Sequence, residues 1–318
     1  MKNWSTNSIK TDLKKRTYWF LNYLLQPIEL YWNYDDNFEL LKKHPPVFIL
    51  GPPRSGTTVL YQLMCQHFSF GYINNFVANW YRLPITATRF YKWKNPEKNT
   101  IDLKSDYGRS NHSFGPHEFG EFWYRWFTRE HFELSKLSKS NILQIQKSIG
   151  GMTKFHHNSM VFKNVVNSVR IQQIGSIFPK CVFILIKRDY LDITQSILKA
   201  RQNLYGNKYH WLSVKIPDYK KIICEPYWIQ AVKQVKDVYS LVQSDMSELG
   251  VDRFITVDYK ELCHDPPQVL TSIYNQFQKK GISVKTDGKF PKSLNYSTGQ
   301  TVSDGDYDHL KKALMSHE

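Results

Sequence analysis

The sequence has few cysteines, and they stand far apart. Its 318 residues include only Cys65, Cys181, Cys224 and Cys263, with no Cys-x-x-Cys pair. This spacing argues against a disulfide framework and against a zinc site, so we expect no metal. Cys65 falls in an expected helix and Cys181 begins an apolar run, which predicts that both are small core residues. The same scarcity fits a reducing compartment, and we expect the protein to be cytoplasmic.

The sequence also lacks a long hydrophobic run. Residues 1–17 are polar and basic, and no apolar core of about 7–15 residues follows them, as a signal peptide would require. Residues 18–32 are rich in aromatic side chains, but Asn22, Pro27 and Glu29 make them too polar to span a bilayer. We interpret them as a helix that lies on the domain. Peripheral contact with a membrane surface is the alternative.

Acidic residues are outnumbered by basic ones. The 28 Asp and Glu against 43 Lys and Arg leave a net charge of +15. Such a charge attracts small anionic ligands, anionic membranes or nucleic acid without choosing among them. The basic residues are spread along the chain, and there is no Gly/aromatic RNA-binding signature and no basic helix. Nucleic acid is therefore not an expected partner.

One stretch has the pattern of a strand, a glycine-bounded loop and a helix. Residues 47–50, Val-Phe-Ile-Leu, are typical of a short buried strand, and a helix is expected from Thr57 to Met64. The loop between Gly51 and Gly56 joins the two. This geometry directs several backbone N–H groups and the positive end of a helix dipole at one spot. It predicts a binding site for a phosphate-sized anion.

The loop nearly matches a Walker A motif, and the difference is informative. Gly51 and Gly56 have the required spacing and Thr58 stands at the Ser/Thr position, but Thr57 occupies the lysine position. An NTPase needs that lysine, together with Mg²⁺, for its triphosphate. Here the only cation of the loop is Arg54. This favours a single anionic group over a magnesium triphosphate and leaves an ATP-dependent P-loop kinase as an alternative.

A second ordered block predicts a βαβ unit and hence a parallel sheet. Its expected strand, helix, strand and helix cover residues 160–164, 168–178, 181–186 and 190–204. Arg188 follows the second strand, and Ser196 lies eight residues further on, in the next helix. Because ligands of open α/β sheets bind beyond the carboxyl ends of the strands, both should open on the same edge as the loop. An arginine with a hydroxyl suits a second phosphate.

The other segments are expected to flank this core. Residues 70–117 show little periodicity and are interpreted as an irregular substrate-side excursion. A helix over 141–157 is expected to be interrupted at Gly150-Gly151, and 205–224 is a candidate lid. The pattern further predicts a long amphipathic helix over residues 226–250 and a strand over 253–257. A helix over 268–280, a loop over 285–305 and a short terminal helix follow.

Together these motifs resemble the sulfotransferases that use 3′-phosphoadenosine 5′-phosphosulfate. Residues 52–58, Pro-Pro-Arg-Ser-Gly-Thr-Thr, are similar to the 5′-phosphosulfate loop of that family, and Arg188-Asp189 with Ser196 is similar to its 3′-phosphate motif. Phe162-Lys163-Asn164 is similar to the strand end of tyrosylprotein sulfotransferases, and residues 255–266 resemble the segment near the adenine. The similar blocks run from about 46 to 64 and from 161 to 266. Tyr190 departs from the Pro or Gly that often follows the Asp.

The resemblance implies a P-loop NTPase-like sulfotransferase fold, an α/β fold with a parallel central sheet and flanking helices. Residues 1–318 would form one domain, with an N-terminal helical segment of about 1–44 and an acceptor-side insertion of about 70–160. The implied reaction moves a sulfuryl group to a hydroxyl, or less favourably an amine, of a small-molecule or carbohydrate acceptor, without a metal. Oligomeric state does not follow from the motifs.

The resemblance also implies roles for single residues. The 5′-phosphosulfate would be held by Arg54, Ser55, Gly56, Thr57 and Thr58. Arg188 and Ser196 would hold the 3′-phosphate, and Tyr259 lies in the segment near the adenine. Lys163 would stabilise the leaving oxygen, and Arg54 would also act on the reacting group.

The catalytic base is not at the place where many family members have it. They place a His or Glu about twenty residues after the basic residue of the loop, and residues 71–76 here contain no group that titrates near neutral pH. We therefore choose Glu118, with His117 second, Glu121 third and His112 as a further candidate. A catalytically inactive relative and a basic phosphate- or nucleic-acid-binding protein without catalysis are the remaining alternatives.

Overall fold

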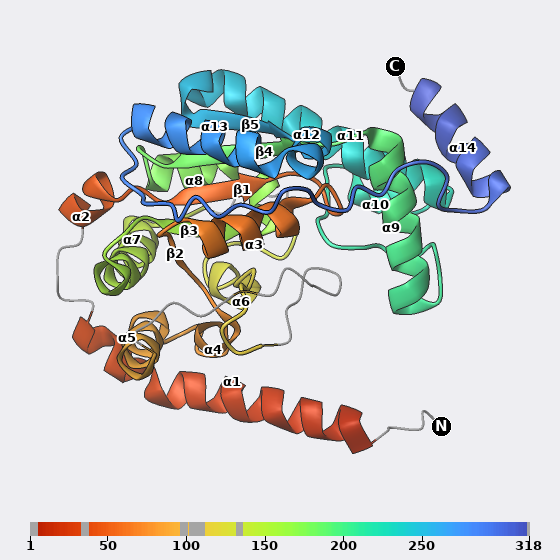
Figure 1. The fold of residues 1–318 in the computed structure, drawn as a ribbon. Coiled ribbons are helices and arrows are strands. Elements are labelled where there is room, and N and C mark those ends of the chain that lie inside the picture. Colours follow the sequence, from red (N-terminus) through yellow and green to blue (C-terminus); the bar gives the residue numbers. More distant parts are fainter. Residues whose placement is uncertain (1–5, 33–37, 96–100, 102–111, 132–135, 317–318) are drawn as a thin grey trace.

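The computed structural model describes residues 6–32, 38–95, 101, 112–131 and 136–316, and Figure 1 shows their arrangement. Residues 1–5 and 33–37 of the expected N-terminal segment lie outside the described residues. So do residues 96–100, 102–111 and 132–135 of the expected insertion.

A parallel five-stranded sheet lies at the centre, in the order β2-β3-β1-β4-β5. Its strands are β1 (Val47–Leu50), β2 (Gly71–Tyr72), β3 (Met160–Lys163), β4 (Val182–Lys187) and β5 (Phe254–Asp258). The central strand β1 pairs with β3 on one side and with β4 on the other. The expected α/β class with a parallel central sheet is confirmed.

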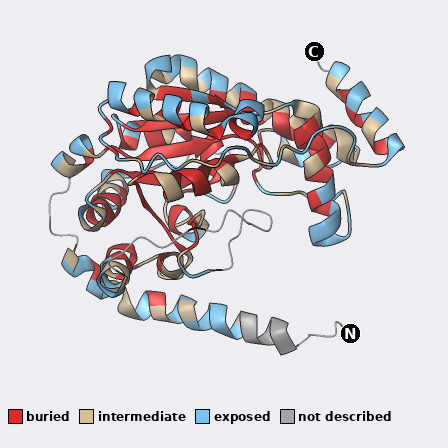
Figure 2. Cartoon of the chain, in the orientation of Figure 1, coloured by how far each residue is buried: buried red, intermediate tan, exposed pale blue. Residues whose placement is uncertain are grey.

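Helices cover both faces of the sheet, as its sequence requires. Side chains of a strand alternate between faces, and those of β1 are buried on both. Phe48 and Leu50 join a core with α7 (Lys139–His156), α8 (Ile171–Ile177) and α11 (Tyr227–Leu249). Val47 and Ile49 join a second core with α3 (Thr57–His67), α12 (Tyr259–His264) and α13 (Pro266–Lys279). Figure 2 shows the buried sheet between these layers.

The expectation of an irregular segment over 70–117 was wrong in part. Strand β2 at its start completes one edge of the sheet, and α4 (Asn75–Ala78) and α5 (Pro84–Lys94) follow. A strand of two residues is too short to show a hydrophobic periodicity. Its parallel partner, β3, lies far away in the sequence. β2 exists because it pairs with β3.

The expected interruption at Gly150-Gly151 was also wrong, because α7 continues through both residues. A Cβ atom on Gly151 would lie 2.4 Å from the side chain of Ile85 on α5. Glycine at this position therefore serves the close packing of α5 on α7 and does not end the helix.

The remaining elements surround this core. They are α1 (Thr6–Trp32), α2 (Phe38–Lys43), α6 (Gly120–Trp123), α9 (Tyr190–Tyr205), α10 (Tyr219–Ile222), α14 (Asp304–Met315) and the 3₁₀ turns Val165–Val169 and Val251–Arg253. Cys65 and Cys181 are buried, as predicted, and all four cysteines are free. Among the helices that the structure describes, none combines the length and apolarity needed to traverse a bilayer.

Candidate functional site

The loop after β1 delivers the chain into an uncapped helix. Arg54 (φ 71°) and Gly56 (φ 102°) both adopt left-handed backbone angles that turn the chain into α3. The N-cap residue of α3, Gly56, has no side chain that could accept a hydrogen bond from the first turn. The first N–H groups of a helix have no partner inside it, so those of Thr57 and Thr58 are available, together with the positive end of the dipole. This is an anion-binding geometry.

Tyr259 closes the loop from the side of β5. A Cβ atom on Gly56 would lie only 2.2 Å from the Tyr259 ring, so the contact requires glycine. The Arg188 guanidinium lies 4.8 Å from the centre of the same ring. Burial raises the pKa of the Tyr259 hydroxyl to about 12, which keeps it protonated at neutral pH.

The two expected phosphate motifs meet at this loop. Arg54 Nε donates a hydrogen bond to Ser196 Oγ at 3.0 Å, across 142 residues of chain. Arg188 Nη1 donates to the carbonyl of Arg54 at 3.1 Å. Arg188 therefore holds the left-handed turn of the loop, and both arginines lie beyond the carboxyl edge of the sheet. The motifs open on the same edge, as the sequence predicted.

Two residues that support the loop were missed by sequence reasoning. Ser168 accepts a hydrogen bond from the Gly51 N–H at 2.9 Å and donates one to the Gly51 carbonyl at 3.2 Å. The Tyr239 hydroxyl accepts from the Arg188 N–H and donates to the Ile186 carbonyl, each at 3.1 Å. Both hold the backbone through long-range contacts, and no local pattern marks either residue.

Lys163 lies beside the loop at the end of β3. It stands opposite Ile49 of β1 in the parallel register, and its side chain is only 4% exposed. Its Nζ forms an ion pair with the Glu118 carboxylate, which is 35% exposed. The neighbouring Asn164 donates from Nδ2 to the Glu118 carbonyl at 3.3 Å. The leading candidate base and the candidate leaving-group cation thus form one pair.

Glu118 lies next to the segment where the family resemblance expected a base. The His117 N–H donates to the Ile73 carbonyl at 2.8 Å, and Asn74 forms an antiparallel bridge with Pro116. Asn74 itself accepts a hydrogen bond from the Val77 N–H and caps α4. Asn74 therefore has a structural role, and Glu118 lies two residues from the bridge that pairs Asn74 with Pro116.

The other candidate bases have different surroundings. His117 Nδ1 accepts a hydrogen bond from the Phe119 N–H at 2.8 Å. The Glu121 carboxylate pairs at 3.0 Å with Arg129, and both side chains are exposed. His112 is exposed and stacks on Phe114. Among the described residues, the structure thus pairs Glu118 with Lys163, whereas Glu121 pairs with Arg129 and His112 stacks on Phe114.

The chain between α13 and α14 crosses the same edge of the sheet (Figure 1). Arg188 Nη2 donates to the Ser297 carbonyl at 2.7 Å, and the Tyr296 hydroxyl donates to Asp192 at 2.9 Å. Gln195 donates to the Gly299 carbonyl and accepts from the Thr301 N–H. Sequence reasoning predicted a loop here but not its contacts with the site.

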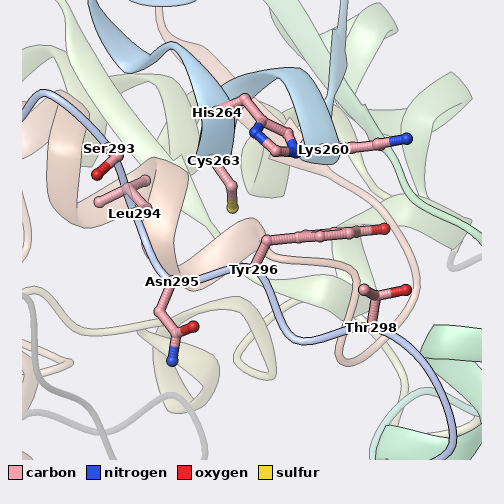
Figure 3. Close-up of a pocket in the computed structure, with 8 residues that line it drawn as sticks. All are labelled: Lys260, Cys263, His264, Ser293, Leu294, Asn295, Tyr296 and Thr298. Atoms are coloured by element: carbon pink, nitrogen blue, oxygen red, sulfur yellow. The ribbon is translucent and has the colours of Figure 1, made fainter.

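A pocket of about 490 Å³ lies between α12 and this crossing segment. Figure 3 shows its lining residues, which are Lys260, Cys263, His264, Ser293, Leu294, Asn295, Tyr296 and Thr298. The Tyr296 ring centre lies 5.9 Å from that of Tyr259 and 5.9 Å from the Arg188 guanidinium. The pocket therefore adjoins Arg188 and Tyr259. In the part of the chain that the structure describes, no cluster of three or more His, Cys, Asp or Glu side chains is arranged to hold a metal ion.

The central strand of a parallel sheet leads into an anion-binding loop, and an arginine that follows the neighbouring strand β4 holds this loop. These features define an α/β protein of the P-loop-like class. A family model described as "Sulfotransferase family" matches residues 45–280. The chain belongs to the sulfotransferase family, as the motifs predicted.

Among the solved structures to which this chain is similar, three are described as sulfotransferases. STF9 from Mycobacterium avium has 16% identity and a TM-score of 0.47, and the match covers 88% of this chain and 72% of that one. The sulfotransferase domain from the curacin biosynthetic pathway has 14% identity and a TM-score of 0.44. This match covers 86% of this chain and 98% of that domain. A sulfotransferase from Alicyclobacillus acidocaldarius has 14% identity and a TM-score of 0.42. This match covers 85% of this chain and 96% of that one. The comparison with curated proteins found no match.

Proposed function

We propose that this chain transfers the sulfuryl group of 3′-phosphoadenosine 5′-phosphosulfate to a hydroxyl of a small-molecule or carbohydrate acceptor. Membership of the sulfotransferase family supports sulfuryl transfer as the reaction class. The observation that carries the proposal is the junction of Arg54, Arg188 and Ser196 at the uncapped loop. It provides cations and donors for two anionic groups, and the Lys163–Glu118 pair lies on the neighbouring strand.

The residues present fit a donor with two anionic groups. Two of the three guanidinium nitrogens of Arg188 donate to backbone carbonyls, whereas its Nε is buried and has no partner among the described residues. A buried donor without an acceptor is costly, and a phosphate oxygen would satisfy it. The N–H groups of Thr57 and Thr58 suit the second anionic group. We assign the adjoining pocket of about 490 Å³ to the nucleoside.

The reaction needs a group that accepts the proton of the acceptor hydroxyl and a cation that offsets the charge on the leaving oxygen. The side chains of Glu118 and Lys163 suit these two requirements. The bound donor supplies an activated sulfuryl group, whose bond to the phosphate oxygen breaks as a bond to the acceptor oxygen forms. In our assignment the Glu118 carboxylate accepts the acceptor's proton. Lys163 offsets the negative charge on the departing phosphate oxygen, and its burial leaves that charge little screened by water. Arg54 and the loop N–H groups orient the sulfuryl group.

The test compares the affinities of 3′-phosphoadenosine 5′-phosphate and AMP by calorimetry. An arginine–phosphate contact in a partly buried site stabilises binding by roughly 1.5–3 kcal/mol, so the bisphosphate should bind about ten- to a hundred-fold more tightly. Arg188→Ala should remove this preference. Lys187→Ala, at the exposed position just before it, is the matched control and should keep it.

Two results would contradict the proposal. Equal affinity of the wild-type protein for the bisphosphate and AMP would remove the second phosphate site. Tight binding of ATP only with Mg²⁺, and activity lost in EDTA, would instead support the P-loop kinase, because sulfuryl transfer by these residues needs no metal. A screen of hydroxyl acceptors in EDTA with labelled donor then tests turnover itself.

A further inference from the structure

Helix α1 packs on the rest of the protein through its polar side chains. The Asn22 amide donates to a backbone carbonyl at 2.8 Å and accepts from the Arg82 N–H at 2.9 Å. Gln26 accepts from Arg82 Nη1 at 2.7 Å. The Glu29 carboxylate accepts from the Ile85 N–H at 2.7 Å and from the next N–H at 3.0 Å, in the first turn of α5. These bonds hold the helix on α5 through three inward polar side chains, and the Tyr18 and Trp32 rings pack beside them on Trp80 and Phe155.

The opposite face of α1 is apolar and exposed. Trp19 is 57% exposed and Tyr31 is 72% exposed. Every exposed position from 19 to 31 is apolar or aromatic, and these are Trp19, Phe20, Tyr23, Leu24, Pro27, Ile28, Leu30 and Tyr31. At about 100° per residue they occupy one continuous half of the helix surface. We call this set the apolar face of α1. The two buried positions of the helix, Asn22 and Glu29, are both polar, whereas a surface helix usually turns its apolar side to the core.

Such a face calls for a partner that covers apolar surface. On soluble proteins, large contiguous patches of exposed apolar side chains commonly mark contact sites for proteins or membranes. Helix α1 lies along one edge of the molecule (Figure 1), and Figure 2 shows exposed positions along its length. As described, α1 is not apolar enough along its length to span a bilayer.

The charges next to the apolar face indicate which partner it fits. Lys14, Lys15 and Arg16 are all exposed in the turn before Trp19. In the described stretch 13–31 no exposed side chain is acidic. Basic side chains beside an apolar, Trp- and Tyr-containing face are characteristic of helices that lie in the interface of an anionic membrane. An anionic surface would neutralise all three cations, whereas this face of a second copy would offer them no exposed acidic side chain.

We propose that the apolar face of α1 binds anionic membrane surfaces, with Lys14, Lys15 and Arg16 at the lipid headgroups. The aromatic side chains sit at the level where Trp and Tyr concentrate in membranes. This property does not depend on the proposed donor or acceptor. It places the protein on a membrane without spanning it.

The test is flotation of the full-length protein with vesicles of phosphatidylcholine and phosphatidylglycerol in equal amounts. Replacing Trp19, Phe20 and Leu24 by Ser together should lower the partition coefficient about a hundredfold, since each loses apolar area that the membrane would bury. Replacing Leu204, Tyr205 and Met315 by Ser, which are exposed on α9 and α14, is the matched control and should not change it. Lys14→Glu with Lys15→Glu should lower binding at least about tenfold on these vesicles.

Binding that is equal in the wild type and the Trp19/Phe20/Leu24 variant would overturn the proposal, and so would absence of wild-type binding. Light scattering adds a second readout. A wild-type dimer that the same triple substitution converts to a monomer would assign the face to a second copy instead. Because all substituted side chains are exposed, unchanged thermal unfolding of the variants is expected and confirms that they fold.

Discussion

Lys163 and Glu118 form an ion pair at the site, and we propose two roles for this pair, as charge partner of the leaving oxygen and as base. Lys163 comes from the end of β3 and is 4% exposed, whereas Glu118 precedes α6 and is 35% exposed. Removing the carboxylate charge leaves the lysine without its anionic partner, although Lys163 still faces the loop that is proposed to bind an anion. Substitution at Glu118 should therefore affect proton transfer much more than donor binding.

Glu118→Gln keeps the shape of the side chain and removes its capacity to accept a proton. We expect kcat to fall by at least about a hundredfold, because a positioned general base contributes about 10²–10⁴-fold. Affinity for 3′-phosphoadenosine 5′-phosphate should not weaken, because the nearby Lys163 charge is then less compensated. Single-turnover kinetics and calorimetry measure the two effects separately.

The matched control is Glu121→Gln, three residues further on. Its carboxylate pairs with Arg129 at the surface, and kcat should stay within about twofold of the wild type, as is usual for an exposed ion pair. Normal turnover of Glu118→Gln together with inactivity of His117→Ala or His112→Ala would show that the base has been misassigned.

At the scale of elements, the strand–loop–helix unit around Arg54 could be predicted because its signals are local. A buried apolar run, two spaced glycines and a helical pattern all lie within residues 47–64. The contacts that fix the loop were not predictable, because they come from Ser168, 117 residues away, and from Tyr239 on α11. Strand β2 was missed for the same reason, since only its pairing with β3 defines it.

Gly56 provides a direct test of this loop, because two costs act at one position. Alanine there must adopt a left-handed φ of 102° and also place a Cβ 2.2 Å from the Tyr259 ring. A left-handed alanine costs about 1 kcal/mol, and overpacking adds about 1–3 kcal/mol. We expect Gly56→Ala to lower the free energy of unfolding by about 2–4 kcal/mol and to weaken donor binding at least about tenfold.

Gly206→Ala separates the two costs. Gly206 also has a positive φ, 67°, but a Cβ there would meet no atom within 4 Å. Denaturant unfolding of this control should show only the backbone cost of about 1 kcal/mol. In addition, Gly56→Ala should cost less stability in a Tyr259→Ala background than in the wild type, which a double-mutant cycle measures. If Gly56→Ala and Gly206→Ala are equally stable, the close contact between the loop and Tyr259 does not exist.

At the scale of the whole molecule, the site is assembled from distant parts of the chain. Four separate segments contribute Arg54, Lys163, Arg188 and Ser297. The first three could be placed from the sequence because each lies at or just after the end of a strand, whereas no sequence pattern indicated Ser297. A further link joins the insertion to the segment 205–224. The Lys215 N–H donates to His131 Nδ1 at 2.9 Å, and the other ring nitrogen lies 2.9 Å from the Tyr124 hydroxyl. His131 thus ties these parts together as a neutral imidazole.

This link should make the stability of the protein depend on pH. His131 is only 8% exposed, and burial, with the nearby charges of Arg170 and Lys215, lowers its pKa from 6.5 to about 4. As the pH falls below 6.5, the unfolded chain binds a proton at this residue and the folded protein does not. The stability that neutral His131 provides is therefore complete above pH 6.5 and is lost as the pH falls toward 4. By linkage, the loss at pH 5 is about 2 kcal/mol relative to pH 7.5.

His131→Gln isolates this contribution, because glutamine keeps one acceptor and one donor but does not titrate. Urea unfolding at pH 7.5 and pH 5 should show that the variant loses about 2 kcal/mol less than the wild type over this interval. The exposed His210, changed to Gln, serves as the control and should follow the wild-type pH dependence. A His131→Gln variant that loses as much stability as the wild type would mean that other groups cause the acid destabilisation.

Because His131 contacts Lys215, the same acid range should also loosen residues 205–224, which hydrogen exchange at the Lys215 amide would detect.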